Sequence, residues 1–449
     1  MSTHVNAPNP APVPAPVVAP AMPASTFLRR HWPWLAMLVI MLVLPWLFFD
    51  HARGRHSGFA ITLMSEMALM AVFALSYNML MGQAGLLSFG HAILFGIGAY
   101  TVAHTLNWIK ASGIPIPVEL MPLFGGFGGL VCGILAGYVA TKQRATAFAM
   151  ITMGIGELLT ASALMFMTFF GGEGGITTDR VTDTSIFGVA YTSPIQVYYL
   201  LVVWALIAAL LMYLQTQTPL GRMANATRDN FERTQFVGYD PRRIRYWQFI
   251  LAGFFAGMAG GMYCLVYEIV TFDTLAAVKS ANALLATYIG GAVGFFGPVM
   301  GAVLVVGMQS GVSLHTSAWL LYLGVIFIAM VMFAPGGLLG LVGNHIPIAR
   351  MGRLGDLVVP YARIFFPAAL ATAGFVLFVE LVTHQTIGAS QGKKFAMLGQ
   401  PMNADSALVW IVAIVAMLAG ALWLRREGSF FMARWNALIE DAKARGIMS

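Results

Sequence analysis

The sequence predicts an all-α, polytopic membrane protein, and two observations carry that prediction. Of the 449 residues, 59% are hydrophobic and only 10% are charged. A soluble domain usually carries roughly 25% charged residues, so this composition excludes a water-soluble enzyme and a disordered chain. The apolar residues also stand in long continuous runs, each near the ~20 residues that a spanning helix needs. The short alternating segments of a β-barrel are not seen.

The basic residues indicate membrane topology rather than nucleic-acid binding. The formal net charge is +7, but the Lys and Arg residues lie mainly in short segments between apolar runs. Such a distribution is typical of the cytoplasmic loops of membrane proteins. No nucleic-acid partner is therefore expected.

Residues 1–30 are predicted to form an Ala/Pro-rich cytoplasmic tail. Prolines occupy alternate positions from Pro8 to Pro16, and this pattern favours extended, polyproline-like structure. The stretch lacks the basic start and the small-residue cleavage site of a removable signal peptide. The first apolar run, which follows Arg30, is therefore expected to be retained as a span.

About 10–12 apolar segments follow this tail. Their approximate ranges are 32–49, 59–81, 84–107, 118–141, 145–170, 194–214, 247–271, 281–298, 299–317, 319–334, 364–382 and 406–424. Some of them are expected to be re-entrant, because Gly-rich and Pro-broken segments are tolerated at membrane depth when protein surrounds them.

The basic clusters predict which loops face the cytoplasm. Even numbers of predicted crossings separate the clusters, which places all of them on the cytoplasmic side. The clusters are Arg29/Arg30, Lys142/Arg144, the Arg-rich loop 215–246, Arg350/Arg353/Arg363 and Arg425/Arg426. An acidic loop then lies outside, with Glu173, Asp179 and Asp183, together with the basic exceptions Arg53, Arg55, Lys393 and Lys394.

Residues 215–246 form a long, organised polar loop. Thr218-Pro219 and Asp240-Pro241 each place an N-cap residue before a proline at the first helical position. A less polar stripe recurs at helical spacing, made of Leu220, Ala224, Thr227 and Phe231. Gly238 can end this helix. Two short helices beneath the bilayer are predicted, which either rest on lipid headgroups or form a docking surface for a soluble partner.

Several glycine-rich segments stand in order along the chain with this polar loop. The loop reads GRMANATRDNFERTQFVGYDPRRIRYWQFILAGFFAGMAGGMY. The other segments are YNMLMGQAGLLSFGHAILFGIGAYT (77–101), FAMITMGIGELL (148–159), GGEGGI (171–176), GGAVGFFGPVMGAVLV (290–305) and APGGLLGL (334–341). Together, over about residues 59–341, they resemble the permease subunit of branched-chain amino acid ABC importers, the LivM type.

The resemblance implies a function, partners and a domain division. It implies a permease of an ATP-binding cassette importer that carries branched-chain or other hydrophobic amino acids across the bacterial inner membrane. The implied partners are a second related permease subunit, two cytoplasmic ATP-binding subunits, a periplasmic substrate-binding protein and membrane lipid. The permease domain would span 31–341, with 215–246 as its coupling loop. Residues 342–449 would be a C-terminal extension with two further spans and an amphipathic tail.

The coupling motif is carried over residue by residue, with one departure. The matching residues are Gly221, Arg222, Arg228, Asp229, Asn230 and Gly238. The family usually has Glu directly after Arg-Asp-Asn, where this chain has Phe231 and then Glu232. Because a helix turns about 100° per residue, Glu232 does not replace the missing carboxylate. Phe231 is therefore expected to act as an apolar knob in a groove of the ATPase.

The chain is expected to be a non-catalytic subunit that binds no cofactor. Its nearest approach to a phosphate-binding loop, GASQGKK at 388–394, is one residue short and lacks Ser or Thr after the Lys. ATP would then be used by the partner subunits. No second ligand stands at metal-binding spacing from His91, so no metal site is expected.

Polar residues inside apolar runs are candidates to line the translocation route, because such groups tend to face cavities or partners. The candidates are Asn78, Gln83, Ser88, His91, Glu66, Glu157, Gly290 and Gly294. Glycines near 82–85 and 290–301 break their apolar stretches, as paired broken helices around a midplane site would. The alternatives are tight packing and, for Glu66 and Glu157, pairing with a neighbouring subunit.

Two other functions stay open on the sequence. A urea or short-chain amide ABC permease would share these motifs, and the binding protein would largely set the solute. An ATP-independent secondary transporter or channel would need no ATPase at all.

Overall fold

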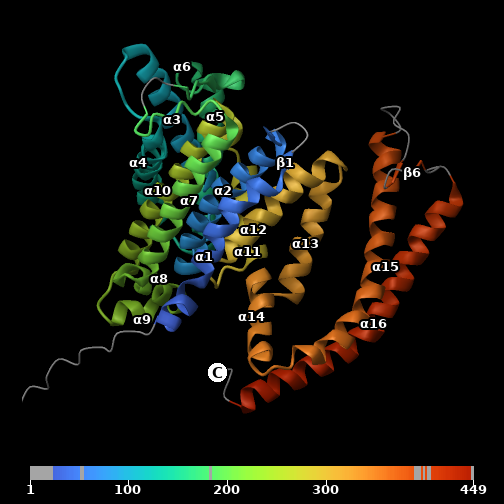
Figure 1. Cartoon of the computed structure of the whole chain (residues 1–449). Helices are drawn as coiled ribbons and strands as arrows, with labels where there is room; N and C mark the ends of the chain where they lie inside the picture. The colour runs from blue at the N-terminus through green and yellow to red at the C-terminus, as the bar shows by residue number, and fades with distance from the viewer. Residues whose placement is uncertain are drawn as a thin grey trace, which may run out of the picture.

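The computed structural model describes residues 24–50, 55–181, 185–388, 396–397, 400–401 and 406–445. Most of the predicted tail, Arg53, Asp183, Lys393, Lys394 and most of the segment 388–394 lie outside the described residues. Within them the fold is all-α, as predicted (Figure 1). Nine described helices are long and apolar enough to cross a membrane, or ten if one pair bent by 45° counts as a span.

The helices follow one another with short connections. In the first half they are α1 (Ala24–Leu47), α2 (Gly58–Asn78), α3 (Ala92–Ser112), α4 (Met121–Ala140), α5 (Ala145–Met165), α6 (Met167–Phe170), α7 (Pro194–Gln217), α8 (Pro219–Asp229) and α9 (Phe231–Phe236). In the second half they are α10 (Pro241–Tyr267), α11 (Ala277–Gly290), α12 (Gly297–Val306), α13 (Trp319–Phe333), α14 (Gly337–Arg350), α15 (Val358–Thr383) and α16 (Ala407–Ala444). The bent pair is α13 with α14.

Short turns and strands complete the described chain. The π-helical turns are η1 (Met79–Gln83), η5 (Gly307–Gly311) and η8 (His384–Gly388). The 3-10 turns are η2 (Val118–Leu120), η3 (Gly172–Gly174), η4 (Phe272–Thr274), η6 (Val312–Leu314) and η7 (Leu354–Leu357). Three antiparallel pairs of two-residue strands join β1 (Phe49–Asp50) to β2 (Arg55–His56), β3 (Ile176–Thr177) to β4 (Ile269–Val270), and β5 (Ala396–Met397) to β6 (Gln400–Pro401).

Helix α10 lies at the centre of the bundle and packs closely on α3 and α4. A Cβ atom on Gly257 would lie 2.8 Å from the backbone nitrogen of Gly129, so no side chain fits between α10 and α4. On the other side, Gly98 of α3 meets the backbone of Gly257 just as closely. Because lipid gives no hydrophobic force between helices, such small-residue contacts are what hold spans together. The aromatic core beside them includes Tyr77, Phe95 and Tyr100.

The two ends of the bundle differ in charge as the sequence predicts. At one end, Arg245 of α10 donates to the Gln143 carbonyl at 3.1 Å, which brings Lys142 and Arg144 to the polar loop. At the opposite end, β3 pairs with β4, and Lys110 forms an ion pair with Asp179 at 3.1 Å. The Val181 backbone N–H, which donates to the Asp179 carboxylate, holds the pKa of that group below its usual range, with help from Lys110. Figure 1 shows α6 at the end opposite to α8 and α9.

Two predicted segments differ from the observed helices. The run expected at 84–107 begins as a helix only at Ala92, because residues 85–91 form a non-helical connection. The run expected at 281–298 is split: α11 ends at Gly290, and α12 begins at Gly297. With 14 residues, or about 21 Å of helix, α11 is too short to cross the bilayer alone.

The C-terminal helices form a separate pair beside the bundle (Figure 1). Leu381 of α15 and Ala413 of α16 are fully buried against each other's helices. At its lower end the pair is tied together by Arg353, which forms ion pairs with Asp356 and with Asp441 at 2.8 and 2.7 Å. The last predicted span and the described part of the tail predicted over 430–449 form one continuous helix, α16.

Candidate functional site

The polar loop is folded by three local caps, two of them predicted. Thr218 accepts a hydrogen bond from the Gly221 backbone N–H at 3.3 Å, and Asp240 accepts one from Arg242 at 2.9 Å. Between them, Asn230 accepts from the Arg233 backbone N–H at 2.8 Å and begins a new helix. The single helix expected to continue to Gly238 is therefore wrong, because Asn230 in extended geometry divides it into α8 and α9. Gly238, at φ +93°, ends α9 as expected.

Arg228 connects this loop to the first break in the bundle. Its guanidinium donates to the backbone carbonyl of Gly82, at the end of η1. A Cβ atom on Gly85 would lie 2.9 Å from the Arg228 side chain, so the two segments also pack directly. Arg228 further pairs with Asp229 at 2.9 Å. Arg228 therefore joins α8 to residues 82–85.

Phe231 lies inside the loop rather than at its tip. The Arg144 guanidinium carbon stands 3.2 Å from the centre of its ring, and that of Arg245 stands 5.2 Å away. These contacts cover part of the ring within this chain and leave Phe231 half-buried, and its contact with an ATPase stays a prediction. By contrast, Phe236 and Val237 are exposed to 89% and 68%, at the end of α9.

The remaining loop residues divide into exposed and packed groups. Arg222, Asp229 and Glu232 are exposed. Gly221 is buried, and a Cβ atom there would lie 2.8 Å from the Cα atom of Thr216. Gly221 therefore serves the close turn from α7 into α8, whereas these charged residues face outward.

A buried glutamine network surrounds the first break. Gln248 of α10 donates to Gln83 at 3.0 Å and to the Met79 carbonyl at 3.0 Å. Gln215 of α7 donates to Gln248 at 2.8 Å. These bonds join α7, η1 and α10 at the same depth as Arg228. Gln83 thus helps to hold the first break in place. Its partners Gln215 and Gln248 were not predicted from the sequence.

The other predicted route residues near this break are buried. Asn78 and Ser88 each leave a side-chain oxygen without a hydrogen-bond partner among the described residues. His91 bonds Ser76 at 3.0 Å and is packed against the rings of Phe73 and Tyr77. No group of three potential metal ligands occurs among the described residues.

The second break is a helical hairpin that reaches the first one. The chain descends through α11, turns at residues 291–296 and returns through α12. A Cβ atom on Gly301 would lie 2.9 Å from the Gly290 backbone nitrogen, and one on Gly82 would lie 2.5 Å from the Ala292 carbonyl oxygen. The two breaks therefore meet. Gly290 and Gly294 pack against backbone or Leu339 and offer no side chain to a route.

Polar residues also converge between α2, α10, α11 and η5, nearer the acidic end. Glu66 of α2 accepts a hydrogen bond from Ser310 at 2.6 Å. Lys279 of α11 lies 5.1 Å from the centre of the Tyr263 ring. One turn further along α11, Asn282 donates to Gln309 at 3.1 Å. Only Glu66 was predicted from the sequence, since Lys279 stands between two apolar runs and looks like loop.

Glu157 is not part of this convergence. It is exposed on α5, beside Met153, Gly154 and Leu158, which are exposed as well. A Cβ atom on Gly154 would meet no atom within 4 Å. The Glu157 side chain therefore points away from the helices of this chain.

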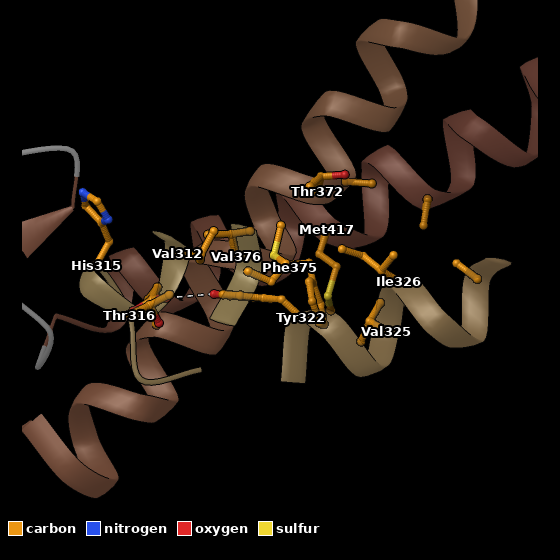
Figure 2. Close-up of a pocket in the computed structure, with 15 residues that line it drawn as sticks. Val312, His315, Thr316, Tyr322, Val325, Ile326, Thr372, Phe375, Val376 and Met417 are labelled. Carbon is orange, nitrogen blue, oxygen red and sulfur yellow. Dashed lines mark hydrogen bonds between the residues drawn. The ribbon is translucent and has the colours of Figure 1, made fainter. Parts of the chain in front are cut away.

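A cavity of about 800 Å³ lies elsewhere, between the bundle and the C-terminal pair. Figure 2 shows Tyr322, Val325 and Ile326 of α13 beside the same space as Phe375 and Met417. Tyr322 donates to Glu380 at 2.8 Å, the main polar contact of its wall. This cavity includes neither the breaks nor the polar loop.

Comparisons with known proteins match the same part of the chain. Residues 59–335 match the protein family described as branched-chain amino acid transport system / permease component. The chain is 27% identical over 326 residues to the high-affinity branched-chain amino acid transport system permease protein LivM of Salmonella typhimurium, covering 68% of this chain and 74% of that protein. It is 26% identical over 343 residues to LivM of Escherichia coli, covering 72% and 78%. No solved structure matches the chain.

Proposed function

The chain belongs to the branched-chain amino acid transport system permease family, a multi-pass protein of the inner membrane, and from this premise we propose that it is the permease of an ATP-driven importer. The imported solutes are branched-chain and other hydrophobic amino acids. The chain itself hydrolyses no ATP and binds no cofactor. Two cytoplasmic ATPases supply the energy, and a periplasmic binding protein delivers the solute.

One observation carries the proposal: the polar loop contacts the break in the bundle through Arg228 and Gly82. A secondary transporter binds no ATPase, so it does not need a folded polar loop in contact with the break in the bundle. The exposed apolar side chains at the end of α9, Phe236 and Val237, give a soluble partner a surface to grip. Apolar anchors of this kind commonly dominate the affinity of protein interfaces.

The mechanism follows from these contacts. ATP binding moves the partner ATPases and with them α8 and α9. Arg228 passes this displacement to residues 82–85, and the Gln83–Gln248–Gln215 network passes it on to α10 and α7. Because the first break meets the turn at Ala292, both broken segments shift together. The route then opens toward the cytoplasm.

The second permease subunit covers α5. A carboxylate exposed on a span is costly in lipid and is generally paired. Glu157 lies beyond the middle of α5, among exposed apolar residues. A neighbouring helix that supplies a hydrogen-bond donor would remove this cost.

Reconstituted transport tests the proposal. The chain is produced together with the permease and ATPase genes beside it, purified as a complex and placed in proteoliposomes with the binding protein inside or outside. We expect leucine uptake that needs ATP and two ATPase subunits per complex. Uptake that follows an ion gradient without ATP would contradict the importer, and uptake of urea or acetamide in place of leucine would change the solute.

A further inference from the structure

Two opposite charges face each other across the outer half of the bundle, and neither is neutralised by a direct ion pair among the described residues. Glu66 lies on α2 and accepts a hydrogen bond from Ser310 at 2.6 Å. Lys279 lies near the start of α11. Both side chains are half-buried. They sit between helices α2, α10 and α11, near the acidic end of the molecule.

The lysine is held without an acceptor. Its ammonium stands 5.1 Å from the centre of the Tyr263 ring. Among the described residues, no oxygen lies within hydrogen-bond distance of it, although the carboxylates of Glu66 and Asp273 attract its charge. An ammonium has three N–H donors. A half-buried ammonium that offers them to no protein group is placed to receive a ligand anion.

The two charges together match one class of solute. An α-amino acid at neutral pH carries a carboxylate and an ammonium a few bonds apart. We infer that Lys279, held beside the Tyr263 ring, binds the α-carboxylate and that Glu66 binds the α-ammonium. This inference rests on the proposed function and deepens it, because it assigns the residues that recognise the solute.

The same pair excludes neutral solutes. Urea or an amide can hydrogen-bond to either group, but it brings no opposite charge to neutralise Lys279 or Glu66. A site built to bond a charged group rejects an analogue that lacks it, because its own buried groups are left unpaired. Asn282 and Gln309, bonded to each other one turn further along α11, continue this polar surface inward.

Substitutions that keep size and remove charge test the site. Lys279→Gln and Glu66→Gln are introduced into the full complex, and the initial rate of leucine uptake is measured against leucine concentration. The controls are Lys443→Gln and Glu440→Gln, which neutralise exposed residues in the last turns of α16. We expect KM for leucine to rise at least about tenfold in the first two variants, as loss of one charge-assisted hydrogen bond predicts, and to stay unchanged in the controls.

A solute analogue separates the two charges. Leucinamide keeps the ammonium and lacks the carboxylate. We expect Lys279→Gln to impair leucine transport far more than leucinamide transport, whereas Glu66→Gln impairs both. Co-purification of the ATPases with each variant verifies that the complex has formed.

The failures are distinguishable. Leucine uptake with a wild-type KM in Lys279→Gln or Glu66→Gln would overturn this inference and leave the importer intact. Leucine uptake without ATP would overturn the importer alone. Transport of urea or acetamide but not leucine by the unmodified complex would overturn the amino acid solute and this site together.

Discussion

Arg228 shows how much one side chain contributes when it joins two segments far apart in sequence. Its guanidinium donates to the Gly82 carbonyl, 146 residues away. A hydrogen bond to a charged group contributes about 1.5–3 kcal/mol. Without it, the loop and the break are no longer joined by a directional bond.

Arg228→Met is therefore expected to uncouple the importer. The ATPases should still co-purify, because their proposed surface at Phe236 is untouched, while ATP-dependent uptake falls roughly ten- to hundredfold, the range that this bond energy gives. Arg426→Met, at an exposed residue of α16 outside the polar loop, serves as the control. Loss of the ATPases from the Arg228 variant would mean that the residue contacts them directly.

The departure of this chain from its family at Phe231 has a structural consequence. The ring is covered by Arg144 and Arg245 from other segments. The ring therefore packs α9 against Arg144 and Arg245, while the Phe236 side chain stays exposed. Cation–π contacts of this kind contribute about 0.5–2 kcal/mol.

Phe236→Ser is expected to reduce co-purification of the ATPases, and Phe231→Leu is expected to preserve it. The first variant removes an exposed ring, whereas the second keeps an apolar side chain in its packed position. Quantifying ATPase recovered per permease distinguishes them. If Phe231→Leu reduced ATPase recovery and Phe236→Ser did not, Phe231 would be the residue that contacts the ATPases.

At the scale of elements, the α11–α12 hairpin depends on glycine at its closest approach. Gly301 leaves no space for a Cβ against the Ala286 carbonyl and the Gly290 nitrogen. Gly324 of α13 differs, because a Cβ atom added there would meet no described atom within 4 Å.

Gly301→Val is expected to lower the unfolding free energy by about 1–3 kcal/mol or more, as overpacking does. Gly324→Val should leave it nearly unchanged. Thermal unfolding of the detergent-solubilised permease, followed by tryptophan fluorescence, measures both. Equal melting temperatures would show that α11 and α12 are not packed as described.

The exposed face of α5 leads to a prediction about the assembly. A photo-reactive p-benzoylphenylalanine at position 157 should cross-link to the second permease subunit within the complex. The same residue at Leu211, an exposed position on α7, is the comparison site. A cross-link only to lipid at 157 would place the partner elsewhere.

At the scale of the whole molecule, the C-terminal pair lies beyond the part of the chain that the family model matches. The family match ends at residue 335, before α15 and α16. One small buried cluster lies within the pair, and a second joins Leu438 of α16 to Ile348 of α14. The cavity of about 800 Å³ separates part of the pair from α13. The buried residues around α10 do not include it.

A chain ending at Arg350 is therefore expected to insert into the membrane and to retain its ATPases. The truncation removes the Arg353–Asp441 ion pair together with both of its partners, so no buried charge is left behind. Size-exclusion chromatography and co-purification verify this outcome. If the shortened chain aggregated, the C-terminal pair would be required for the permease to fold.

The sequence predicted the features that depend on local chemistry. Length and hydropathy of the runs set the all-α class, because only helices satisfy the backbone of such segments in lipid. Thr218 and Asp240 marked helix starts correctly, because a cap bonds atoms only two or three residues away. The breaks near Gly82 and Gly290 were predicted for the same reason, from glycines in otherwise apolar runs.

Only the tertiary structure decided which of these residues meet. The contact of Arg228 with Gly82, the cover of Arg144 over Phe231 and the convergence of Glu66 with Lys279 join segments that are distant along the chain. Spacing in one sequence carries no information about such pairs. From spacing alone, Glu66 and Glu157 were both predicted to line the translocation route. In the structure, the packing of α2 turns Glu66 inward, whereas the packing of α5 turns Glu157 outward.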